Sequence, residues 1–330
     1  MMFKQSIIEL SAYHPQKELC EIILDANESY VNAPYNRYPD SIALDLRREI
    51  AQQNKLSVES IMVGNGSSEL IDLVMKCTLS PGDQLLTFGP TFSIYELNAA
   101  ILGAETVTMM LGDTFDFDAK AFVAQMEAVA PKLIILCNPN NPTGTLLTKA
   151  QIMAIVEATE AVVVVDEAYI EFGGESVMDL TSTCKNLIVL RTLSKAYGLA
   201  GVRVGYMVTS ADNIEIIDKV RPPYNVSAVA QKIALETLQD GLKFEKVIDE
   251  ILEEKEMMMG VMKSWVQIYP GGGNFIFFKT DKADLYEALV LKGIRIRKYS
   301  GGLDGYYRVT IGSKLDNSRL IEAMEAIYEI

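Results

Sequence analysis

Two short apolar runs constrain the fold of this chain more than any other feature of its sequence. Residues 161–165 read Ala-Val-Val-Val-Val and lead into Asp166, and the nearly continuous apolar run at 132–136 leads into a loop of asparagines and prolines. A strand that is apolar at every position is buried on both faces, which is typical of a parallel sheet between layers of helices. In open sheets of that class, ligands bind beyond the carboxyl ends of the strands. The sequence therefore predicts an α/β fold whose functional residues directly follow such strands.

The length of the chain and the pattern after residue 225 predict a second, smaller domain. A chain of 330 residues exceeds the size of a typical single hydrophobic core. From residue 227 to about 263, a long helical pattern carries alternating charges, which fits one connecting helix with a solvated face. Shorter strand and helix patterns follow, as in a small α+β unit. We predict a large domain at residues 30–225 and a small domain that combines an N-terminal arm, residues 1–29, with residues 226–330.

Composition narrows the classes of function. Asp and Glu outnumber Lys and Arg by 44 to 30, and this acidic balance argues against nucleic acid or an anionic membrane as a partner. No uncharged run is long enough to span a bilayer, and the N-terminus lacks a signal-peptide core. The cysteines show no metal-binding spacing and are expected to be reduced, as in a cytoplasmic protein; they are Cys20, Cys77, Cys137 and Cys184. With a single histidine, His14, we expect no metal site, and lysine becomes the leading candidate for proton transfer.

The segment from Thr192 to Arg203 is the strongest candidate for chemistry. It follows an apolar strand at 187–190 and reads Thr-Leu-Ser-Lys-Ala-Tyr-Gly-Leu-Ala-Gly-Val-Arg, which puts Lys195 in a turn of small residues. A lysine near an arginine suits a covalently held carbonyl cofactor that also bears a phosphate. Read alone, Lys195 and Arg203 could equally be solvated charges, so this interpretation depends on the cofactor's other partners.

A glycine turn at residues 64–68, Gly-Asn-Gly-Ser-Ser, lies between a strand pattern and a helical pattern. Free NH groups and the positive end of the helix dipole favour an anion at such a point. A dinucleotide site would need glycine three residues after Gly66, where the chain has Glu69. A phosphate site and a purely structural turn are the two interpretations that remain.

Three further positions follow predicted strands. The loop at residues 138–144 contains two Asn-Pro steps, which favour an extended backbone and can present Asn141 rigidly. Asp166 could serve a ligand or stabilise a turn. Phe92, after the strand pattern at 85–88, could lie over a planar ring or pack in a core.

Three strings in this order resemble the fold-type-I pyridoxal 5'-phosphate (PLP) aminotransferases and, within that family, the histidinol-phosphate aminotransferase branch. They are Ser-Lys-x-Tyr-Gly-Leu-Ala-Gly-x-Arg-x-Gly at 194–205, Asn-Pro-Asn-Asn-Pro-Thr-Gly at 138–144 and Asp-Glu-Ala-Tyr at 166–169. The similarity extends from about Tyr13 to Gly312. It implies a three-layer sandwich with a mostly parallel central sheet, plus a smaller α+β domain.

The resemblance also implies a role for each candidate residue. Lys195 would form a Schiff base with PLP, and Asp166 would pair with the pyridinium nitrogen and keep it protonated, so that the ring withdraws electrons. At the ring itself, the implied contacts are Tyr169 and Asn141 at the hydroxyl and Phe92 stacked on the face. The phosphate would be held by the Gly66 turn, Ser67, Ser68, Thr192, Ser194 and Arg203, with Tyr38 reaching it from a neighbouring subunit.

The implied substrate-binding residues are Tyr13, Asn27, Asn141, Arg297 and Arg308. Arg295 is a rival for the place of Arg297, because both are near the same predicted strand. After Asn27-Glu28, where the family commonly has proline, this chain has Ser29-Tyr30. The substrate therefore follows less directly from the resemblance than the cofactor does.

The sequence thus predicts a homodimeric PLP aminotransferase that works by ping-pong transamination in L-histidine biosynthesis. Histidinol phosphate and 2-oxoglutarate are the expected substrates. An aromatic amino acid aminotransferase and a threonine-phosphate decarboxylase are alternatives on the same scaffold. A PLP-binding regulatory protein is the non-enzyme alternative, which the presence of both Lys195 and Asp166 disfavours.

Overall fold

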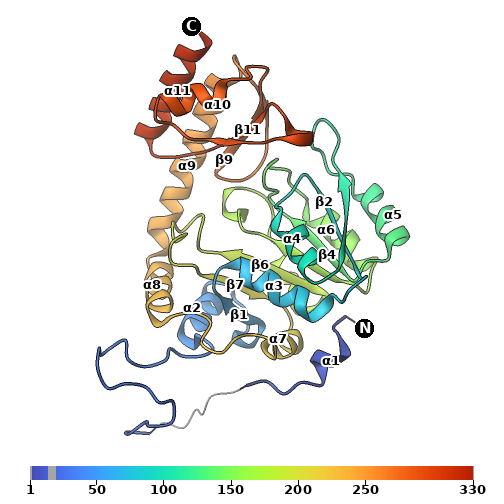
Figure 1. Ribbon diagram of the computed structural model, residues 1–330, viewed down its shortest axis with the longest axis vertical. Coiled ribbons are helices and arrows are strands. Elements are labelled where there is room, and N and C mark those ends of the chain that lie inside the picture. Colours follow the sequence, from blue (N-terminus) through green and yellow to red (C-terminus); the bar gives the residue numbers. More distant parts are fainter. Residues whose placement is uncertain (1, 14–19, 330) are drawn as a thin grey trace.

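A seven-stranded sheet forms the centre of the protein. The computed structural model describes residues 2–13 and 20–329, so His14 lies outside the described residues. The strands are arranged in the order β1-β7-β6-β5-β4-β2-β3 (Figure 1). In that order they are Ile61–Gly64, Gly205–Val208, Leu187–Thr192, Val162–Asp166, Leu133–Cys137, Gln84–Gly89 and Glu105–Met110. Within this sheet only β7 runs against the common direction, which confirms the mostly parallel sheet.

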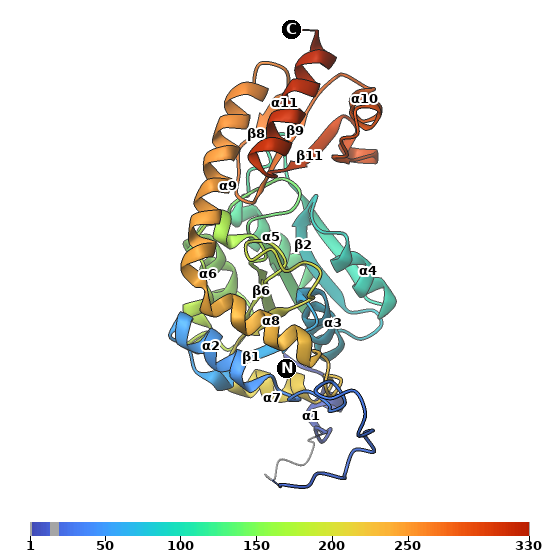
Figure 2. The same ribbon diagram turned by 90° about the vertical axis from the view of Figure 1, so that its left-hand side faces the viewer.

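Helices cover both faces of this sheet. On β5, Val163 and Val165 belong to one apolar core, and Val162 and Val164 belong to another. Full burial of such a side chain contributes about 1.5–3 kcal/mol, so both faces hold the sheet in place. The first core is covered by α2 (Leu44–Asn54), α5 (Ala119–Val129), α6 (Lys149–Glu157) and α8 (Ala228–Gln239), and the second by α3 (Ser67–Thr78), α4 (Ile94–Ile101) and α7 (Ala211–Asp218). The predicted three-layer sandwich is confirmed (Figure 2).

A smaller antiparallel sheet lies above the central sheet in the view of Figure 1. Its strands, in the order β10-β11-β9-β8, are Arg297–Lys298, Tyr306–Thr310, Phe275–Lys279 and Gln267–Tyr269. It packs with α9 (Gly241–Met262), α10 (Leu285–Leu291) and α11 (Lys314–Tyr328). Side chains such as Met258, Phe278 and Met324 form a third apolar core between them. The predicted α+β unit is therefore confirmed.

The connection between the two sheets differs from the single helix predicted at 227–263. The chain forms α8 and α9, which meet at Asp240. Asp240 has φ −96° and ψ 36°, and Gly241 follows it; both residue types have low helix propensity, which accounts for the break. Helix α8 packs on α2 of the large sheet, whereas α9 continues to the small sheet (Figure 2). The residues after 225 thus contact both sheets, and the domain boundary at residue 225 stays a prediction.

One buried amine joins α9 to the loop before β9. Lys255 is 5% exposed and donates hydrogen bonds from Nζ to the carbonyl oxygens of Gly271, at 2.5 Å, and Gly273, at 2.9 Å. Between them, Gly272 donates its backbone NH to the carbonyl oxygen of Gly144 at 2.8 Å. Lys255 thereby holds the loop that contacts the Asn-Pro loop of the large sheet.

The later part of the N-terminal segment, residues 20–40, extends outside the body formed by the two sheets (Figure 1). After α1 (Gln5–Ile8), the described residues from 20 to 40 contain no regular helix or strand. Their large apolar side chains are solvent-exposed, with Ile22 75%, Leu24 86% and Tyr30 92% exposed. Apolar side chains gathered in this way mark a surface for interaction.

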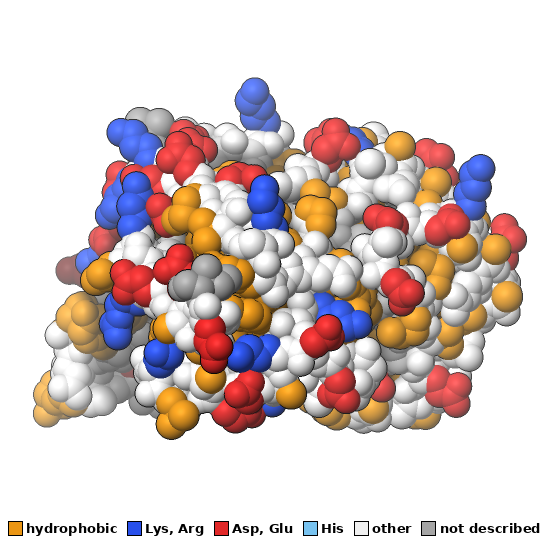
Figure 3. Space-filling view, turned by 90° about the horizontal axis from the view of Figure 1, so that it is seen from above, with side chains coloured by type: hydrophobic (Ala, Val, Ile, Leu, Met, Phe, Trp, Pro, Cys, Tyr) orange, Lys and Arg blue, Asp and Glu red, His pale blue; other side chains and the backbone are white. Residues whose placement is uncertain are grey.

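The outer surface elsewhere is mixed in charge. Figure 3 looks down on the end of the molecule that carries the small sheet, and acidic and basic side chains are interspersed over that face. Within the described part of the chain, none of the helices has both the length and the apolar character needed to cross a membrane.

Candidate active site

Three side chains that follow predicted strands meet at one edge of the central sheet. β5 ends at Asp166, and β6 leads into the turn that carries Lys195. Lys195 Nζ lies 5.2 Å from the centre of the Tyr169 ring, and its charge interacts with the Asp166 carboxylate. The chain thus brings an amine, a carboxylate and a phenol together at one point.

The turn that carries Lys195 is held by its own backbone. Leu193 donates its NH to the carbonyl oxygen of Val204 at 3.0 Å and accepts a hydrogen bond from the NH of Leu199 at 2.9 Å. Gly198 has φ 67°, a left-handed conformation that glycine adopts without steric cost. The small residues after Lys195 therefore allow a compact turn, which fixes the position of the Lys195 backbone.

Asp166 is buried, and its hydrogen bonds and the Lys195 charge offset part of the cost of burying its own charge. The residue is 3% exposed, and burial raises the pKa of its carboxyl group. Tyr95 donates its hydroxyl to Asp166 Oδ2 at 2.7 Å, and the NH of Ala168 donates to Oδ1 at 3.1 Å. These hydrogen bonds and the Lys195 charge oppose the effect of burial on the pKa. Tyr95 was not among the predicted site residues, although it is three residues after Phe92, at the start of α4.

The Lys195 amine is easier to deprotonate than an ordinary lysine. Partial burial lowers its pKa, and the positive charges of Arg308 and Arg203 lower it further, whereas the Asp166 carboxylate raises it. The net direction is downward. A larger fraction of Lys195 is therefore a free amine at neutral pH than for a solvated lysine.

The three asparagines of the Asn-Pro loop have different hydrogen-bond partners. The Asn138 amide exchanges two hydrogen bonds with the backbone of Leu147, at 3.1 and 2.9 Å. Asn140 donates to the carbonyl oxygen of Pro90 at 2.9 Å. Asn141 accepts a hydrogen bond from Arg308 of the small sheet through Oδ1. The first two asparagines fix the loop, and Asn141 is the one presented across the gap between the sheets.

A cradle for an anion forms where Gly66 meets Arg203. Gly66 has φ 78°, and a β-carbon there would lie 2.3 Å from Nη2 of Arg203, so the guanidinium occupies the space that a side chain would need. A β-carbon on Gly205 of β7 would lie 2.5 Å from the backbone nitrogen of Ser67, so glycine is also needed for β7 to approach the start of α3. The amide end of α3 and the Arg203 charge therefore favour the same anion.

The other predicted phosphate residues surround this cradle. Ser194 donates its NH to Thr192 Oγ1 at 3.2 Å, and Arg203 Nη1 lies 3.5 Å from Ser194 Oγ. Ser67 and Ser68 begin α3. Glu69 is turned away, because its carboxylate accepts hydrogen bonds from the NH of Asn65 and the amide of Asn225. These positions suit a phosphate, since the acidic side chain next to the cradle is already paired.

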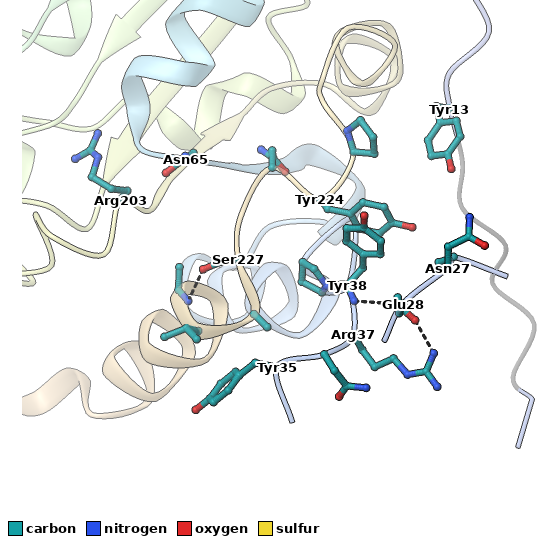
Figure 4. Close-up of a pocket in the computed structure, with 18 of the residues that line it drawn as sticks. Tyr13, Asn27, Glu28, Tyr35, Arg37, Tyr38, Asn65, Arg203, Tyr224 and Ser227 are labelled. Atoms are coloured by element: carbon teal, nitrogen blue, oxygen red, sulfur yellow. Dashed lines mark hydrogen bonds and ion pairs between the residues drawn. The ribbon is translucent and has the colours of Figure 1, made fainter. Parts of the chain in front are cut away.

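The arm residues line a cavity to which Lys195 does not contribute. A cavity of about 1410 Å³ is lined by Tyr13, Asn27 and Tyr38 on one side and by Arg203 on the other (Figure 4). The Tyr38 ring stacks on Tyr224, with centroids 4.5 Å apart and planes 16° apart. The described lining of this cavity includes neither Lys195 nor Asp166. Within one chain, the arm residues and the amine are therefore not brought together.

The small sheet presents two arginines side by side. Arg297 of β10 is the antiparallel partner of Arg308 on β11, so their side chains emerge from the same face. Tyr307, which precedes Arg308 on β11, points instead into the third core. Arg295 precedes β10 and lines the same 690 Å³ cavity as the other two arginines. The pairing favours Arg297 over Arg295 as the partner of Arg308.

A buried ion cluster lies directly behind the ends of β5 and β6. Arg191 Nε lies 2.8 Å from Glu167 Oε2, and Arg191 Nη1 lies 2.8 Å from Glu171 Oε1. The three side chains are 11%, 0% and 13% exposed, respectively. Two of the three neighbour a predicted site residue in sequence, because Glu167 follows Asp166 and Arg191 precedes Thr192. Sequence analysis missed this cluster, since nothing local in the sequence shows that Arg191 pairs with carboxylates of another segment.

Solved structures share this architecture. Histidinol-phosphate aminotransferase from Sinorhizobium meliloti, solved in complex with pyridoxal-5'-phosphate, aligns with a TM-score of 0.84 and 24% identity over 92% of this chain and 89% of that chain. L-threonine-O-3-phosphate decarboxylase from Porphyromonas gingivalis aligns with a TM-score of 0.78 and 25% identity over 90% of this chain and 92% of that chain.

Sequence comparison finds relatives with higher identity than these solved structures. Histidinol-phosphate aminotransferase of Caldanaerobacter subterraneus subsp. tengcongensis is 36% identical over 312 residues, which are 93% of this chain and 89% of the relative. The family model described as aminotransferase class I and II matches residues 5–327. The chain therefore belongs to the class I and II aminotransferase family.

Proposed function

We propose that this chain, a pyridoxal 5'-phosphate-dependent aminotransferase, transfers the amino group of histidinol phosphate to 2-oxoglutarate in L-histidine biosynthesis. The observation that carries the proposal is the 36% identity, over 93% of the chain, to a histidinol-phosphate aminotransferase. Because the amino group of histidinol phosphate is on a secondary carbon, the expected products are a ketone and glutamate.

The residues at the sheet edge fit PLP on three independent points. When bound, PLP supplies an aldehyde that holds an amine covalently and a ring that withdraws electrons from the neighbouring carbon. Asp166 offers a buried carboxylate for a protonated ring nitrogen, and Lys195 offers the amine. The proposed phosphate contacts are the Gly66 turn, Ser67, Ser68, Thr192, Ser194 and Arg203, and the proposed ring contacts are Phe92, Asn141 and Tyr169. The support is the convergence of an anion cradle, a buried carboxylate and an activated amine.

Lys195 is also the proposed proton carrier. Its lowered pKa leaves a larger share of Nζ unprotonated at neutral pH, and only that form can take a proton from the carbon that bears the substrate amino group. Tyr169 is a poor competitor for this task, because burial raises the pKa of its phenol to about 12. We therefore assign the proton transfer to Lys195 and a positioning contact at the ring hydroxyl to Tyr169.

Arg308 and Arg297 are the proposed anchors for the acidic group of each substrate. Two guanidinium groups on one sheet face suit a phosphate in the first half-reaction and a carboxylate in the second. The pairing of the two strands supports Arg297, rather than Arg295, as the second anchor. Because the arm and Lys195 are not brought together within one chain, Tyr13 and Asn27 are the proposed cover over the substrate of a neighbouring chain.

A homodimer is the proposed assembly, with Tyr38 reaching the phosphate of the neighbouring site. The support is the arm itself, whose apolar side chains are exposed in the single chain and whose Tyr38 lies in a cavity away from Lys195. Sedimentation should give twice the mass of the chain. We further propose that the protein works in the cytoplasm, which agrees with four free cysteines.

The substrate is tested by absorption spectroscopy. Protein loaded with PLP is titrated with histidinol phosphate while the visible band of the bound cofactor is followed. We expect the band to decrease as the amino group is transferred and to return when 2-oxoglutarate is added, and we expect no such cycle in Lys195→Ala. A band that persists with histidinol phosphate but decreases with an aromatic amino acid would overturn the substrate and leave the class in place.

Decarboxylation of threonine phosphate is a second candidate. The similarity to the decarboxylase from P. gingivalis favours it, since the two chains align over nine-tenths of their length. Incubation with threonine phosphate separates the two functions, because a decarboxylase releases carbon dioxide whereas an aminotransferase needs 2-oxoglutarate and forms glutamate. Carbon dioxide release without 2-oxoglutarate would replace the main proposal.

A further inference from the structure

Tyr95 is a buried tyrosine that contacts both Asp166 and Phe92. It lies in the first turn of α4, is 1% exposed, and donates its hydroxyl to Asp166 Oδ2 at 2.7 Å. Its ring meets the ring of Phe92 edge-on, with centroids 5.6 Å apart and planes at 90°. One side chain therefore joins the aromatic residue proposed for the cofactor ring to the carboxylate proposed for its nitrogen.

The Tyr95 hydroxyl is a donor and not an acid. Burial, and the charge of Asp166, raise the pKa of Tyr95 well above that of an ordinary tyrosine, so its proton stays on the phenol. A neutral phenol that donates to a carboxylate stabilises the ionised form of that carboxylate. The hydrogen bond therefore favours Asp166 as an anion and fixes the direction of one of its two oxygens.

The other groups around Asp166 cannot replace this donor. The NH of Ala168 donates to the opposite oxygen, Oδ1. The thiol of Cys137 donates instead to the carbonyl oxygen of Pro139, which lies 3.5 Å from Sγ. Lys195 and Tyr169 interact with the Asp166 charge, but no hydrogen bond joins either of them to the Asp166 carboxylate in the described structure. Oδ2 thus depends on Tyr95 alone among these groups.

We propose that Tyr95 is a positioning residue that keeps Asp166 charged and aimed at the cofactor ring, and so sets the proton occupancy of the ring nitrogen. This inference rests on the proposed role of Asp166 as the partner of that nitrogen. Phe92 gives Tyr95 its second contact, so the distance between the residue over the ring and the carboxylate at its edge is fixed by one rigid side chain. In this role Tyr95 acts through Asp166 and does not need to contact the substrate.

The test compares Tyr95→Phe with the wild-type protein, using PLP labelled with ¹⁵N in the ring. The ¹⁵N chemical shift of the bound cofactor reports the proton on the ring nitrogen, and equilibrium dialysis of the apoprotein gives the Kd for PLP. We expect the nitrogen signal of Tyr95→Phe to move toward the unprotonated position and the Kd to rise about tenfold, as for loss of a charge-assisted hydrogen bond. Tyr307→Phe, which removes the hydroxyl of an equally buried tyrosine in the small sheet, should change neither.

Asp166→Asn separates a positioning role from a merely structural one. If Tyr95 acts through the Asp166 charge, Tyr95→Phe should have little further effect on Kd in the Asp166→Asn background. Equal effects in both backgrounds, or a wild-type nitrogen shift in Tyr95→Phe, would overturn the inference. Failure of the wild-type protein to bind PLP would instead overturn the proposed function. Tyr95→Met, which also lacks the donor and fills space flexibly, takes the place of Tyr95→Phe if that variant does not fold.

Discussion

Replacing Gly66 with alanine should weaken PLP binding by displacing Arg203. The new β-carbon would lie 2.3 Å from Arg203 Nη2, whereas an ordinary contact is about 3.5 Å, so the guanidinium must move by about 1 Å. A charged hydrogen bond lost in this way contributes about 1.5–3 kcal/mol, which corresponds to a Kd for PLP that is about 10- to 100-fold higher. Equilibrium dialysis of the apoprotein with PLP measures this change.

Gly82→Ala is the matched control for Gly66→Ala. Gly82 has φ 85°, close to the 78° of Gly66, but a β-carbon there meets nothing within 4 Å. Both variants therefore place alanine at a positive φ, which side chains rarely adopt, and only Gly66→Ala meets the arginine. If Gly66→Ala binds PLP as tightly as Gly82→Ala does, the cradle is not where the phosphate binds.

Two buried charges give further predictions for unfolding. Arg191→Met leaves Glu167 and Glu171 buried without their partner and should cost about 3–5 kcal/mol at pH 8, against at most about 1 kcal/mol for the exposed Arg48→Met. Burial already raises the pKa of both glutamates, so each stabilises the fold most at low pH and loses that contribution as pH rises through its folded pKa. The stability lost in Arg191→Met should therefore be smaller at pH 5 than at pH 8 in thermal unfolding. An equal loss at both pH values would contradict this prediction. Lys255→Met should cost about 1–3 kcal/mol at pH 7, because two loop carbonyl oxygens lose their donor. Burial lowers the pKa of Lys255 to about 8, so between pH 8 and 10.5 the unfolded chain binds more protons than the folded chain. The stability of the wild-type protein relative to Lys255→Met should therefore rise across that pH range. A stability difference that does not change with pH would show that burial does not lower the pKa of this amine.

The cofactor side of the site could be predicted because it is built from strand ends. The valines at 162–165 are apolar at every position, and such a run is typical of a strand that is buried on both faces. This pattern alone predicts a central strand that ends at Asp166. Strands that share one direction end at one edge, and the residues that follow them meet without any further information. By contrast, β3 (Glu105–Met110) was not predicted, since this edge strand alternates between exposed and partly buried positions and lacks a continuous apolar run.

Contacts between distant segments could not be predicted in the same way. Tyr95 and Asp166 are 71 residues apart, and their hydrogen bond depends on the direction in which α4 leaves β2. The choice between Arg295 and Arg297 depends on how β10 pairs with β11, and a shift of two residues would bring Arg295 opposite Arg308. Side-chain period shows which face is buried, but not which segment lies against it.

Asn141 shows how the two sheets can act on one ligand. Its amide carries an acceptor, Oδ1, and a donor, Nδ2, and Arg308 uses only the acceptor. Nδ2 can therefore donate to an oxygen of the cofactor ring while Oδ1 keeps Arg308 in place beside it. An incoming substrate carboxylate or phosphate forms a stronger, charge-assisted bond with Arg308 than a neutral amide does, so it can share or displace this contact favourably. In the proposed site, the same asparagine thus couples the cofactor half, built from strand ends, to the arginine that we propose anchors the substrate.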